Sequence, residues 1–392
     1  MRNSVRDVGL RIAARRRARG LTQTQLASVA GVSYATVRAV ERGARTPSDD
    51  VLDALAAALG VDPARLSADA QRAESRVHQA MPVLSAAIAD YDVPADGPVR
   101  SLPRLRAAVA EAVQWRLASQ YVRLATEMPL LLRELSRALR IAEGRDRPEA
   151  ARLLVAAYRA ADAVAYKSGH HDLSARLVDL MRWAAPQAGS DLTSAVVAYV
   201  RTETYFAAHA HRQGLGALET ALDICPDTAD RATTAVRAAL HMRAAVAASR
   251  ASEAEVAESH LAWARRLVER VPEGVYEGTA VGPDSLRIHE VSVGLSNGGS
   301  GITRVLAIAQ QWKPPASMPG ERRSGFSIEV ARAQLWAGQR TAAFDSLRSA
   351  RRIAPQHTRE HPWAREDTRT LRRLQRAPDP ELTRFAEWIG AV

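Results

Sequence analysis

The sequence predicts an all-α protein in which a small N-terminal helix-turn-helix domain precedes a longer array of helical repeats. Two observations carry this prediction. Residues 21–43, LTQTQLASVAGVSYATVRAVERG, have the spacing of two short helices joined by a tight turn, and from about residue 148 onward prolines recur at a nearly constant interval. A chain of 392 residues is long enough to bury two or more cores.

The helix-turn-helix prediction depends on the residue type at four positions counted from Gln23. Ala27 is small, as required where two helices cross at close range, and Gly31 can supply the left-handed backbone of the turn. Val37 and Val40 lie three residues apart, so they share the buried face of the second helix. These positions agree with one another, and the motif is specific.

The same segment contains signals for where its helices begin and end. Thr22 and Ser33 can each cap the helix that follows, and Gly43 can close the second helix. Apolar stripes predict two flanking helices, at Val8 to Arg19 and Ser48 to Leu59, each followed by a glycine.

The segments LTQTQLA, GVSYATV, ERG and TPSDDVLDALAAALGV resemble the XRE or Cro/C1-type repressor family. The resemblance covers residues 1–67 and implies a compact five-helix DNA-binding domain, with residues 62–66 as its short fifth helix. It also implies that the second helix of the pair enters the major groove of a double-stranded DNA operator.

Carried over position by position, the resemblance assigns a DNA-binding face. Ser33, Tyr34, Thr36 and Arg38 would face base edges, and Gln23 would reach a phosphate or a base edge. Arg38 is the best single candidate for reading sequence, because a guanidinium can pair with guanine through two hydrogen bonds. Tyr34 stands where the family often has a long polar side chain, so a thymine methyl or a sugar is its expected contact.

Two arginines at the exit of the second helix, Arg42 and Arg45, are expected to contact phosphates and so fix the register of the protein on DNA. Glu41 is expected to be a structural partner of an arginine in the first helix, such as Arg15 or Arg19, rather than a base contact.

The distribution of charge favours nucleic acid as the partner of the N-terminal domain. Residues 1–66 contain 11 Lys plus Arg and 6 Asp plus Glu, a balance of +5, whereas the other 326 residues contain 43 and 37, a balance of +6. Nearly half of the excess positive charge therefore lies in one sixth of the chain, as DNA binding requires.

Composition restricts the remaining function classes. Cys225 is the single cysteine, which excludes a disulfide framework and a cysteine-based zinc site. The N-terminus lacks the apolar core of a signal peptide, and no apolar stretch approaches the span of a bilayer. We expect a cytoplasmic protein with no membrane partner.

Prolines at positions 186, 226, 272, 315 and 355 define a repeat of 40 to 46 residues. In three units a glycine precedes the proline by 17 residues, which is the spacing of the tetratricopeptide repeat (TPR). We therefore predict a TPR-like helical-repeat solenoid over residues 148–392. The leading helices of its pairs are expected near Ala150 to Lys167, Leu192 to His209, Ala232 to Arg250, Asp284 to Leu295 and Ser324 to Ala337.

Residues 68–147 are expected to form a helical linker region between the two parts. A segment rich in Pro and Gly, VPADGPVRSLP at residues 93–103, interrupts it and is the expected hinge.

The sequence contains none of the motifs that would indicate an enzyme. It has no phosphate-binding loop ending in Lys-Ser or Lys-Thr and no His-Glu-x-x-His zinc helix. The segment GLSNGGSG at residues 294–301 is interpreted as a turn between helices, and adjacent histidines such as His170 and His171 point to different faces of a helix. We predict no catalytic residues, no cofactor and no metal site.

The whole arrangement resembles actinobacterial XRE regulators with a TPR-like sensor domain, an impression to which VGPDSLRIHEVSVGL (281–295) and PQHTREHPWAREDTRTLRRL (355–374) contribute. It more distantly resembles quorum-sensing receptors, although those commonly clamp a peptide with asparagines and this chain has asparagine only at 3 and 297. The resemblance implies a homodimeric transcription regulator with a small-molecule or peptide effector.

Leading helices usually line the concave side of such repeats, and here they carry polar and aromatic residues suited to a ligand. The candidate ligand-binding residues are Tyr199, Glu203, Tyr205, Arg237, His241, Arg287 and His289. Two alternatives remain open: a sensor domain that couples a diffusible effector to DNA binding, or a constitutive regulator whose repeat domain is a scaffold for another protein.

Overall fold

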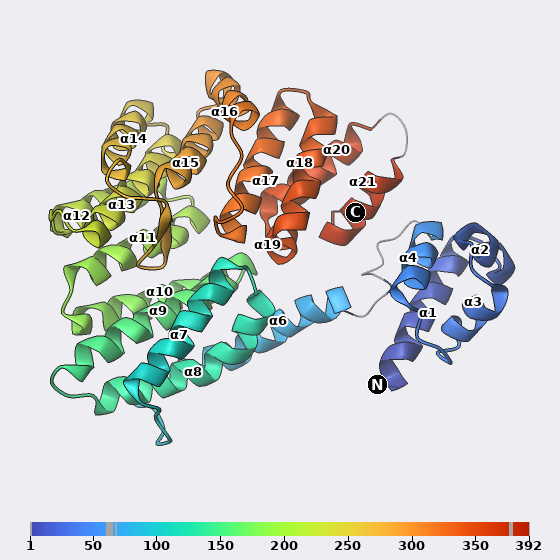
Figure 1. Cartoon of the computed structure of the whole chain (residues 1–392), viewed down its shortest axis with the longest axis horizontal. Helices are drawn as coiled ribbons and strands as arrows, with labels where there is room; N and C mark the ends of the chain where they lie inside the picture. Colours follow the sequence, from blue (N-terminus) through green and yellow to red (C-terminus); the bar gives the residue numbers. More distant parts are fainter. Residues whose placement is uncertain (1, 60–65, 67–68, 376–378, 392) are drawn as a thin grey trace. The chain divides into compact units, whose positions relative to one another are not determined.

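The computed structural model describes residues 2–59, 66, 69–375 and 379–391 of the chain (Figure 1). In this part of the chain nearly every element is a helix, as predicted. The elements are α1 (Arg2–Ala18), α2 (Gln23–Ala30), α3 (Tyr34–Glu41), α4 (Asp49–Ala58), α6 (Asp69–Ala87), α7 (Leu102–Leu117), α8 (Tyr121–Ile141), α9 (Asp146–Lys167), α10 (His171–Ala184), the 3-10 helix η1 (Ala185–Ala188), α11 (Asp191–Ala207), α12 (His211–Ile224), α13 (Arg231–Arg250), α14 (Ala254–Val268), β1 (Gly274–Tyr276), β2 (Thr279–Val281), α15 (Pro283–Ser296), α16 (Gly299–Gln311), α17 (Gly320–Trp336), α18 (Arg340–Ile353), α19 (Pro355–Glu360), α20 (Pro362–Arg373) and α21 (Pro380–Ile389).

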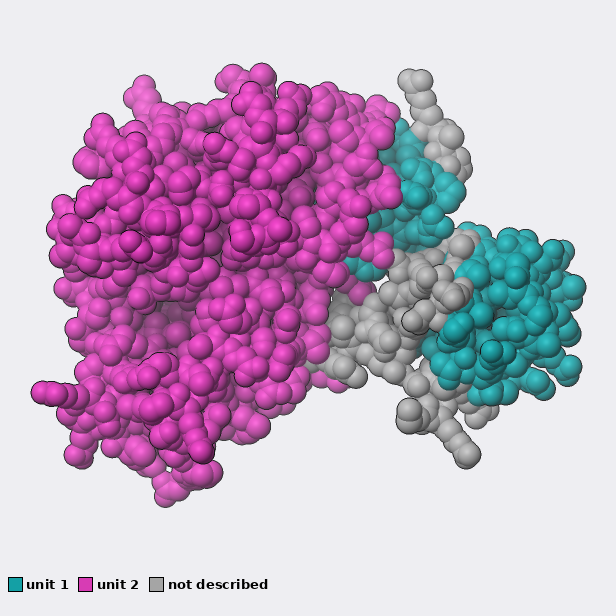
Figure 2. Space-filling model, viewed as in Figure 1, with its two compact units in different colours: residues 1–76, 361–392 teal, residues 77–360 magenta. Residues whose placement is uncertain are grey.

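The chain divides into two compact units, which Figure 2 shows in different colours. Unit 1 contains residues 1–76 and 361–392, and unit 2 contains residues 77–360. None of the helices in the described ranges combines the length and the apolar character that spanning a bilayer requires.

The N-terminal part of unit 1 has its own small apolar core. α1 packs against α3, and α2 packs against both α3 and α4. Ile12, Leu26, Val37 and Leu55 are fully buried where these helices meet. The predicted fifth helix at residues 62–66 lies outside the described residues except for Leu66, which is buried in the same core.

The C-terminal part of unit 1 consists of α20 and α21, which pack against each other. Both helices begin with proline, and the side chain of Asp379 caps α21 by accepting from the backbone N–H groups of Glu381 and Leu382. A proline in the first turn costs no intrahelical hydrogen bond, so these starts are encoded locally.

Unit 2 is built from successive pairs of antiparallel helices. The leading helices are α9, α11, α13, α15 and α17, and all five lie where the proline repeat predicts them. Each leading helix packs against the trailing helix of its own pair and against the next leading helix. The result is an inner layer of leading helices and an outer layer of trailing helices, the arrangement of a helical-repeat solenoid.

A residue with left-handed backbone recurs at the turn inside the pairs. Gly169 and Gly338, the predicted ends of two leading helices, have φ of 81° and 77°. His209 and Ser252 occupy the equivalent positions with φ of 54° and 65°, and Ser119 does so with φ of 57° between α7 and α8. The repeat is thus more regular in backbone than in sequence, since a polar residue replaces glycine at three of these turns.

Residues 77–141 share one continuous core with the helices that follow. Leu84 of α6, Leu105 of α7 and Leu132 of α8 are fully buried in the cluster that also contains Leu154 of α9. The segment at residues 93–101 has no regular secondary structure. Its Arg100 forms hydrogen bonds of 2.7 to 3.0 Å to Glu134 of α8. These contacts do not test the predicted linker, hinge and domain boundaries, which stay predictions.

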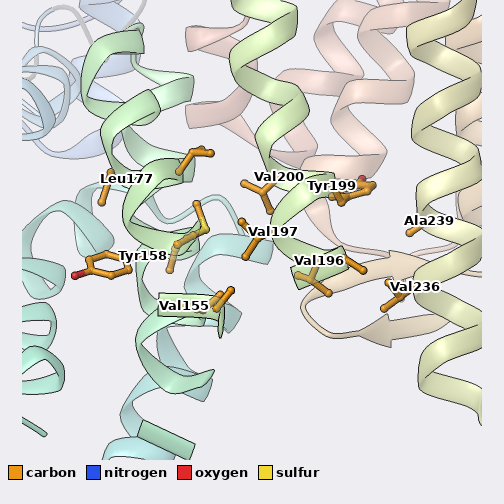
Figure 3. Close-up of a cluster of buried hydrophobic side chains, with 14 of the residues drawn as sticks. Val155, Tyr158, Leu177, Val196, Val197, Tyr199, Val200, Val236 and Ala239 are labelled. Atoms are coloured by element: carbon orange, nitrogen blue, oxygen red, sulfur yellow. The ribbon is translucent and has the colours of Figure 1, made fainter. Parts of the chain in front are cut away.

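Small and β-branched residues explain how tightly the inner layer packs. Figure 3 shows valines of α11, including Val196 and Val200, between Val155 of α9 and Val236 of α13. α13 is buried on most of its circumference and is rich in alanine, with Ala238 among several alanines that have no exposed surface. Alanine favours helix and lets backbones approach closely, so an alanine-rich helix suits the middle of the array.

A two-stranded antiparallel hairpin, β1–β2, departs from the predicted all-α fold in the described part of the chain. Its two-residue turn consists of Glu277 and Gly278, with φ of 46° and 71°. Two consecutive left-handed residues make the type of turn that fits the twist of a hairpin, and glycine adopts the second position without strain.

Candidate functional site

The helix-turn-helix has the local geometry that its sequence predicts. Thr22 and Gln25 form a reciprocal capping box at the start of α2, and the Ser33 hydroxyl caps α3 by accepting from the Thr36 backbone N–H at 3.1 Å. Gly31 ends α2 in the left-handed conformation, with φ of 65°. These predictions are confirmed.

α3 separates a buried face from an exposed face. Val37 and Val40 are buried, as predicted, whereas Tyr34 is 46% exposed and Arg38 is also exposed. Thr36 is half-buried, and its hydroxyl lies 2.8 Å from the Ser33 hydroxyl. The exposed face therefore carries one guanidinium, one phenol and two hydroxyls, which are groups that can contact base edges in a groove.

The two arginines that follow α3 are both exposed. The Arg42 Nε donates to the Arg38 carbonyl at 3.3 Å, which keeps the Arg42 side chain along the end of the helix. Arg45 is exposed in the segment after Gly43.

A buried network of three polar side chains ties α1, α2 and α3 together. The Arg16 guanidinium donates to both carboxylate oxygens of Glu41, at 2.7 and 3.0 Å, and the Gln23 amide donates to Glu41 Oε2 at 2.7 Å. The hydrogen bonds that Arg16 donates to Glu41 raise the pKa of Arg16 above its ordinary value. Every acceptor of the carboxylate that faces the interior has a donor, so the charges balance locally.

The network corrects one detail of the sequence prediction. Glu41 does pair with an arginine of the first helix, but the partner is Arg16 instead of Arg15 or Arg19. Arg16 lies four residues after Ile12, which is fully buried, and thus on the face of α1 that packs against α3. Arg19 instead donates to the Ala58 carbonyl.

The seven predicted ligand-binding residues do not form one site. Four of them have other partners: Tyr205 lies under the Arg201 guanidinium, and Arg287 lies over the Trp312 ring. Arg237 donates to the carbonyls of Leu222 and Cys225 at the end of α12. His241 is hydrogen-bonded to His260 and stacked on Trp263.

The other three predicted residues, Tyr199, Glu203 and His289, lie among buried charges of the leading helices. Tyr199 is 4% exposed and is the centre of this group. Its hydroxyl accepts from Arg322 Nη2 at 2.9 Å. The Arg243 and Arg159 guanidinium carbons lie 4.5 and 5.8 Å from the centre of its ring.

We define the inner charged cluster as Tyr199 with the basic and acidic side chains around it. The basic members come from four helices and outnumber the acidic members by five to two. The members are Arg116 (α7), Arg159 and Lys167 (α9), Tyr199 and Glu203 (α11), Arg243 (α13), and Glu321 and Arg322 (α17).

Both carboxylates of the cluster pair with a cation. Lys167 Nζ lies 3.0 Å from Glu321, and Arg243 Nη2 lies 3.4 Å from Glu203. Burial alone would raise the pKa of Glu321, but Lys167 and the neighbouring cations outweigh it and hold the pKa below its ordinary range. Glu321 is therefore a carboxylate in the cluster.

Two arginines of the cluster use the β1–β2 hairpin as a partner. Arg159 donates to the Glu277 carbonyl at 2.7 Å and to the Thr279 hydroxyl at 2.8 Å, and Arg116 donates to the Gly278 carbonyl. The Arg116 Nε atom is buried and has no hydrogen-bond partner. These arginines are thus held by neutral acceptors and not by carboxylates.

The excess of cations is visible in two pKa values. Burial, and then repulsion from Arg116, lower the pKa of Arg159 to about 9. Burial would raise the pKa of Tyr199, but Arg243, Arg322 and Arg159 outweigh burial and lower it to about 8. A phenol is therefore drawn toward ionisation because the surrounding positive charge has too few counterions.

Side chains next to the cluster leave this imbalance in place. Asp162 is buried and accepts from the Ser174 hydroxyl, and burial raises its pKa well above its usual range. Burial also raises the pKa of Glu329 to about 7, and Arg250 lies near Glu329. With these three included, six basic side chains face four acidic ones, two of which resist ionisation.

Sequence reasoning missed the basic members of the cluster. They are Arg116, Arg159, Lys167, Arg243 and Arg322, of which Arg159 and Arg243 lie in stretches rich in alanine, whereas Arg322 stands between Glu321 and Arg323. A charged residue inside a run of buried alanines, as at Arg159 between Ala157 and Ala160, was a signal that could have indicated a buried functional charge. No group of three or more His, Cys, Asp or Glu that could hold a metal ion occurs within the described ranges.

Comparison with known proteins found a match for the N-terminal region. A search of curated proteins gave no match. A crystal structure of Bacillus thuringiensis PlcR in complex with the peptide PapR7 and DNA is 17% identical, covers 67% of this chain and 95% of that chain, and has a TM-score of 0.29. These values are too low to establish a common arrangement of the two chains. The helix-turn-helix family model matches residues 12–66, which run from α1 through α4 to Leu66. The chain therefore carries at its N-terminus a helix-turn-helix DNA-binding domain of the XRE type.

Proposed function

We propose that this protein is a sequence-specific transcription regulator that reads a double-stranded DNA operator with the exposed face of α3. The observation that carries the proposal is the combination of the family match at residues 12–66 with an α3 that buries Val37 and Val40 and exposes Arg38 and Tyr34. A recognition helix needs that division, because one face must hold the domain together while the other enters the groove.

The proposed contacts fall into two classes. Arg38, Tyr34, Thr36 and Ser33 contact bases, whereas Arg42 and Arg45 contact phosphates and fix the register. Gln23 stands at the N-terminus of α2, where backbone N–H groups favour a phosphate. The Gln23 side-chain amide donates to Glu41, and Arg16 holds Glu41 in place. The position of Gln23 for its proposed contact with a phosphate or a base edge therefore depends on the Arg16–Glu41 pair.

We further propose that unit 2 senses a small molecule or peptide and forms a homodimer. The support for sensing is the inner charged cluster, which gathers buried polar groups from four leading helices around Tyr199. A ligand changes DNA affinity only if it binds one arrangement of the protein better than another. Unit 2 therefore has to adopt at least two states that differ in their affinity for the ligand.

The DNA-binding proposal is tested with the full chain and an operator selected from random-sequence DNA. Arg38→Ala should reduce the preference for that operator over mutated sites by about 1–3 kcal/mol, since one bidentate base contact is lost. Arg42→Ala should weaken operator and random DNA equally and lower the salt slope by about 1. Arg182→Ala, an exposed arginine in unit 2, serves as the control and should change neither quantity. Equal losses on operator and random DNA for Arg38→Ala would contradict the assignment.

The dimer proposal has a separate test. One recognition helix reads only a few base pairs, so two copies on half-sites about 34–36 Å apart are expected. Sedimentation of the full chain, alone and with operator DNA, should give two copies per operator. A single copy in both samples would remove the dimer and leave the DNA-binding proposal intact.

A further inference from the structure

The inner charged cluster has a composition that points to a particular class of ligand. We propose that the cluster binds a small molecule bearing a carboxylate or phosphate oxyanion, held by Arg159, Arg243 and Arg322 beside Tyr199. This inference rests on the proposed function, because it names the class of effector that unit 2 senses.

The first argument is the cost of the cluster to folding. Removing a cation from water costs several kcal/mol, and a nearby carboxylate offsets that cost only if the pair is well matched. Here five basic side chains have two carboxylates, Glu203 and Glu321. Apolar side chains of similar volume would stabilise the fold at least as well. The excess cations are therefore best explained by a counterion that the protein binds.

The second argument is geometry. Arg159, Arg243 and Arg322 reach Tyr199 from three different leading helices, α9, α13 and α17. Guanidinium groups bind carboxylate and phosphate oxygens through pairs of parallel hydrogen bonds. Convergent guanidinium groups from separate helices are arranged to surround one anion, whereas a structural ion pair would need only one of them.

The third argument is the donor capacity that remains. The Nε atoms of Arg116 and Arg243 are buried without a hydrogen-bond partner. A buried donor without an acceptor costs free energy, so native structures nearly always satisfy such groups. The Arg243 and Glu203 side chains are 17% and 22% exposed, so the cluster touches solvent at this pair.

The fourth argument concerns the size of the ligand. The hairpin turn at Glu277 and Gly278 covers one side of the cluster by accepting from Arg159 and Arg116. A Cβ at Gly278 would lie 3.2 Å from Arg159 Nη1 and 3.3 Å from Arg116 Nη2, which shows how closely the turn fits. A site enclosed by a hairpin on one side and by helices on the others fits a small anion better than an extended chain.

Tyr199 provides a spectroscopic test in the full chain. Its pKa of about 8 reflects the cations that face it, Arg243 on α13, Arg322 on α17 and Arg159 on α9, which outweigh burial; Glu203 and Glu321 are the acidic groups of the same cluster and pair with Arg243 and Lys167. The tyrosinate absorbance should show one early-ionising tyrosine in the wild type that is missing in Tyr199→Phe. A bound anion should raise this pKa by about 1 unit, because it takes over the role of counterion.

The probes are inorganic phosphate, succinate and the neutral succinamide, all at one ionic strength set with sodium chloride. A rise in the Tyr199 pKa with phosphate alone assigns a phosphate ligand, and a rise with succinate alone assigns a carboxylate ligand. Succinamide should have no effect. No change with either anion, or an equal change with sodium chloride alone, would overturn the proposal.

Binding of the active probe, measured by calorimetry, should weaken at least about tenfold in Arg322→Gln and Arg243→Gln, since each removes one charged donor. Arg182→Gln is the matched control and should bind normally. Helical content measured by circular dichroism verifies that each variant is folded. If a variant is unfolded, the Tyr199 titration of the wild type with the probes still tests the proposal. If the chain binds the anion but no DNA, the proposed role as a transcription regulator is wrong and the anion site stands. If the chain binds DNA but no anion, the anion site is wrong and the DNA-binding proposal stands.

Discussion

The buried charges of the helix-turn-helix domain differ from those among the leading helices of unit 2. In the first, Arg16 and Glu41 form a one-to-one pair, and Gln23 donates a further hydrogen bond to Glu41 Oε2. In the second, five basic side chains share two carboxylates, and a tyrosine hydroxyl and a hairpin turn supply further acceptors.

The comparison shows how a structural charge network differs from a binding site. The Arg16–Glu41 network needs nothing from outside, because each buried charge has its partner. The inner charged cluster keeps donors without acceptors and lowers the pKa of Tyr199 to about 8. The first network holds helices in place, and the second is arranged for a further anion.

The largest expected effect separates the two groups by removing one cation from each. Arg16→Met leaves the buried Glu41 carboxylate without its charge partner and should destabilise the helix-turn-helix domain by about 3–5 kcal/mol. Arg243→Met removes one of the excess cations and so relieves repulsion among the others. Glu203 still has Lys167 and Arg159 nearby as positive partners, so its carboxylate is not left without a countercharge. Its cost to unit 2 should stay within about 1 kcal/mol.

Hydrogen exchange of the full chain measures both effects, because it reports the opening of each region separately. Arg17→Met, which removes an exposed arginine of α1, is the control for Arg16→Met and should have little effect. Similar destabilisation by Arg16→Met and Arg243→Met would show that the inner charged cluster, like the Arg16–Glu41 network, is a structural charge network.

A second effect depends on pH. The pKa of Tyr199 is about 8 in the folded chain and higher in the unfolded chain, so the unfolded state binds more protons between these values. The stabilisation from Tyr199 is complete above the unfolded pKa and is lost as pH falls through about 8. Between pH 8 and 10 it should add about 2 kcal/mol to the free energy of unfolding of unit 2.

This pH effect is measured by urea unfolding at several pH values, as the difference between the wild type and Tyr199→Phe. The difference cancels groups that both proteins share, such as Cys225, whose pKa is raised by burial. Parallel curves for the two proteins between pH 8 and 10 would contradict a lowered pKa at Tyr199.

The smallest expected effect concerns the hairpin that accepts from the cluster. Gly278→Ala places a Cβ against both guanidinium groups at a residue with φ of 71°, and should loosen residues 274–281 by about 1–3 kcal/mol. Gly216→Ala, on the exposed side of α12 with nothing near its Cβ, should instead stabilise its helix by about 0.5–1 kcal/mol. Hydrogen exchange in the two segments compares them, and an undisturbed hairpin in Gly278→Ala would show that the turn does not depend on its fit to the arginines.

The parts of the molecule that sequence predicted well depend on interactions between near neighbours. The caps at Thr22 and Ser33 and the turn at Gly31 involve residues only a few positions apart, so residue type alone specifies them. The five leading helices lie where the sequence predicts them, because prolines recur between the units and a glycine follows the leading helix in three of them. The β1–β2 hairpin was missed because its strands have only three residues each, too short for an alternating pattern.

The seven predicted ligand-binding residues lie in different places for a geometric reason, and their role stays a prediction. Tyr199 and Glu203 lie four residues apart and share the face of α11 that meets the cluster, whereas Tyr205 lies on another face. Arg237 and His241 also share a face of α13, but it meets α12 and α14, and Arg243 is the residue of α13 that reaches Tyr199. Helical periodicity identifies which residues share a face of a helix, but it does not identify the helix or side chains that pack against that face.

The sequence by itself determined the all-α class, the helix-turn-helix with its exposed α3 face, and the positions of the repeated helices, because periodicity, caps and turns act over a few residues. Only the tertiary structure decided which arginine meets Glu41 and that Arg116, Arg159, Arg243 and Arg322 converge on Tyr199. Those contacts join residues far apart in the chain, and they exist only once the leading helices have packed side by side.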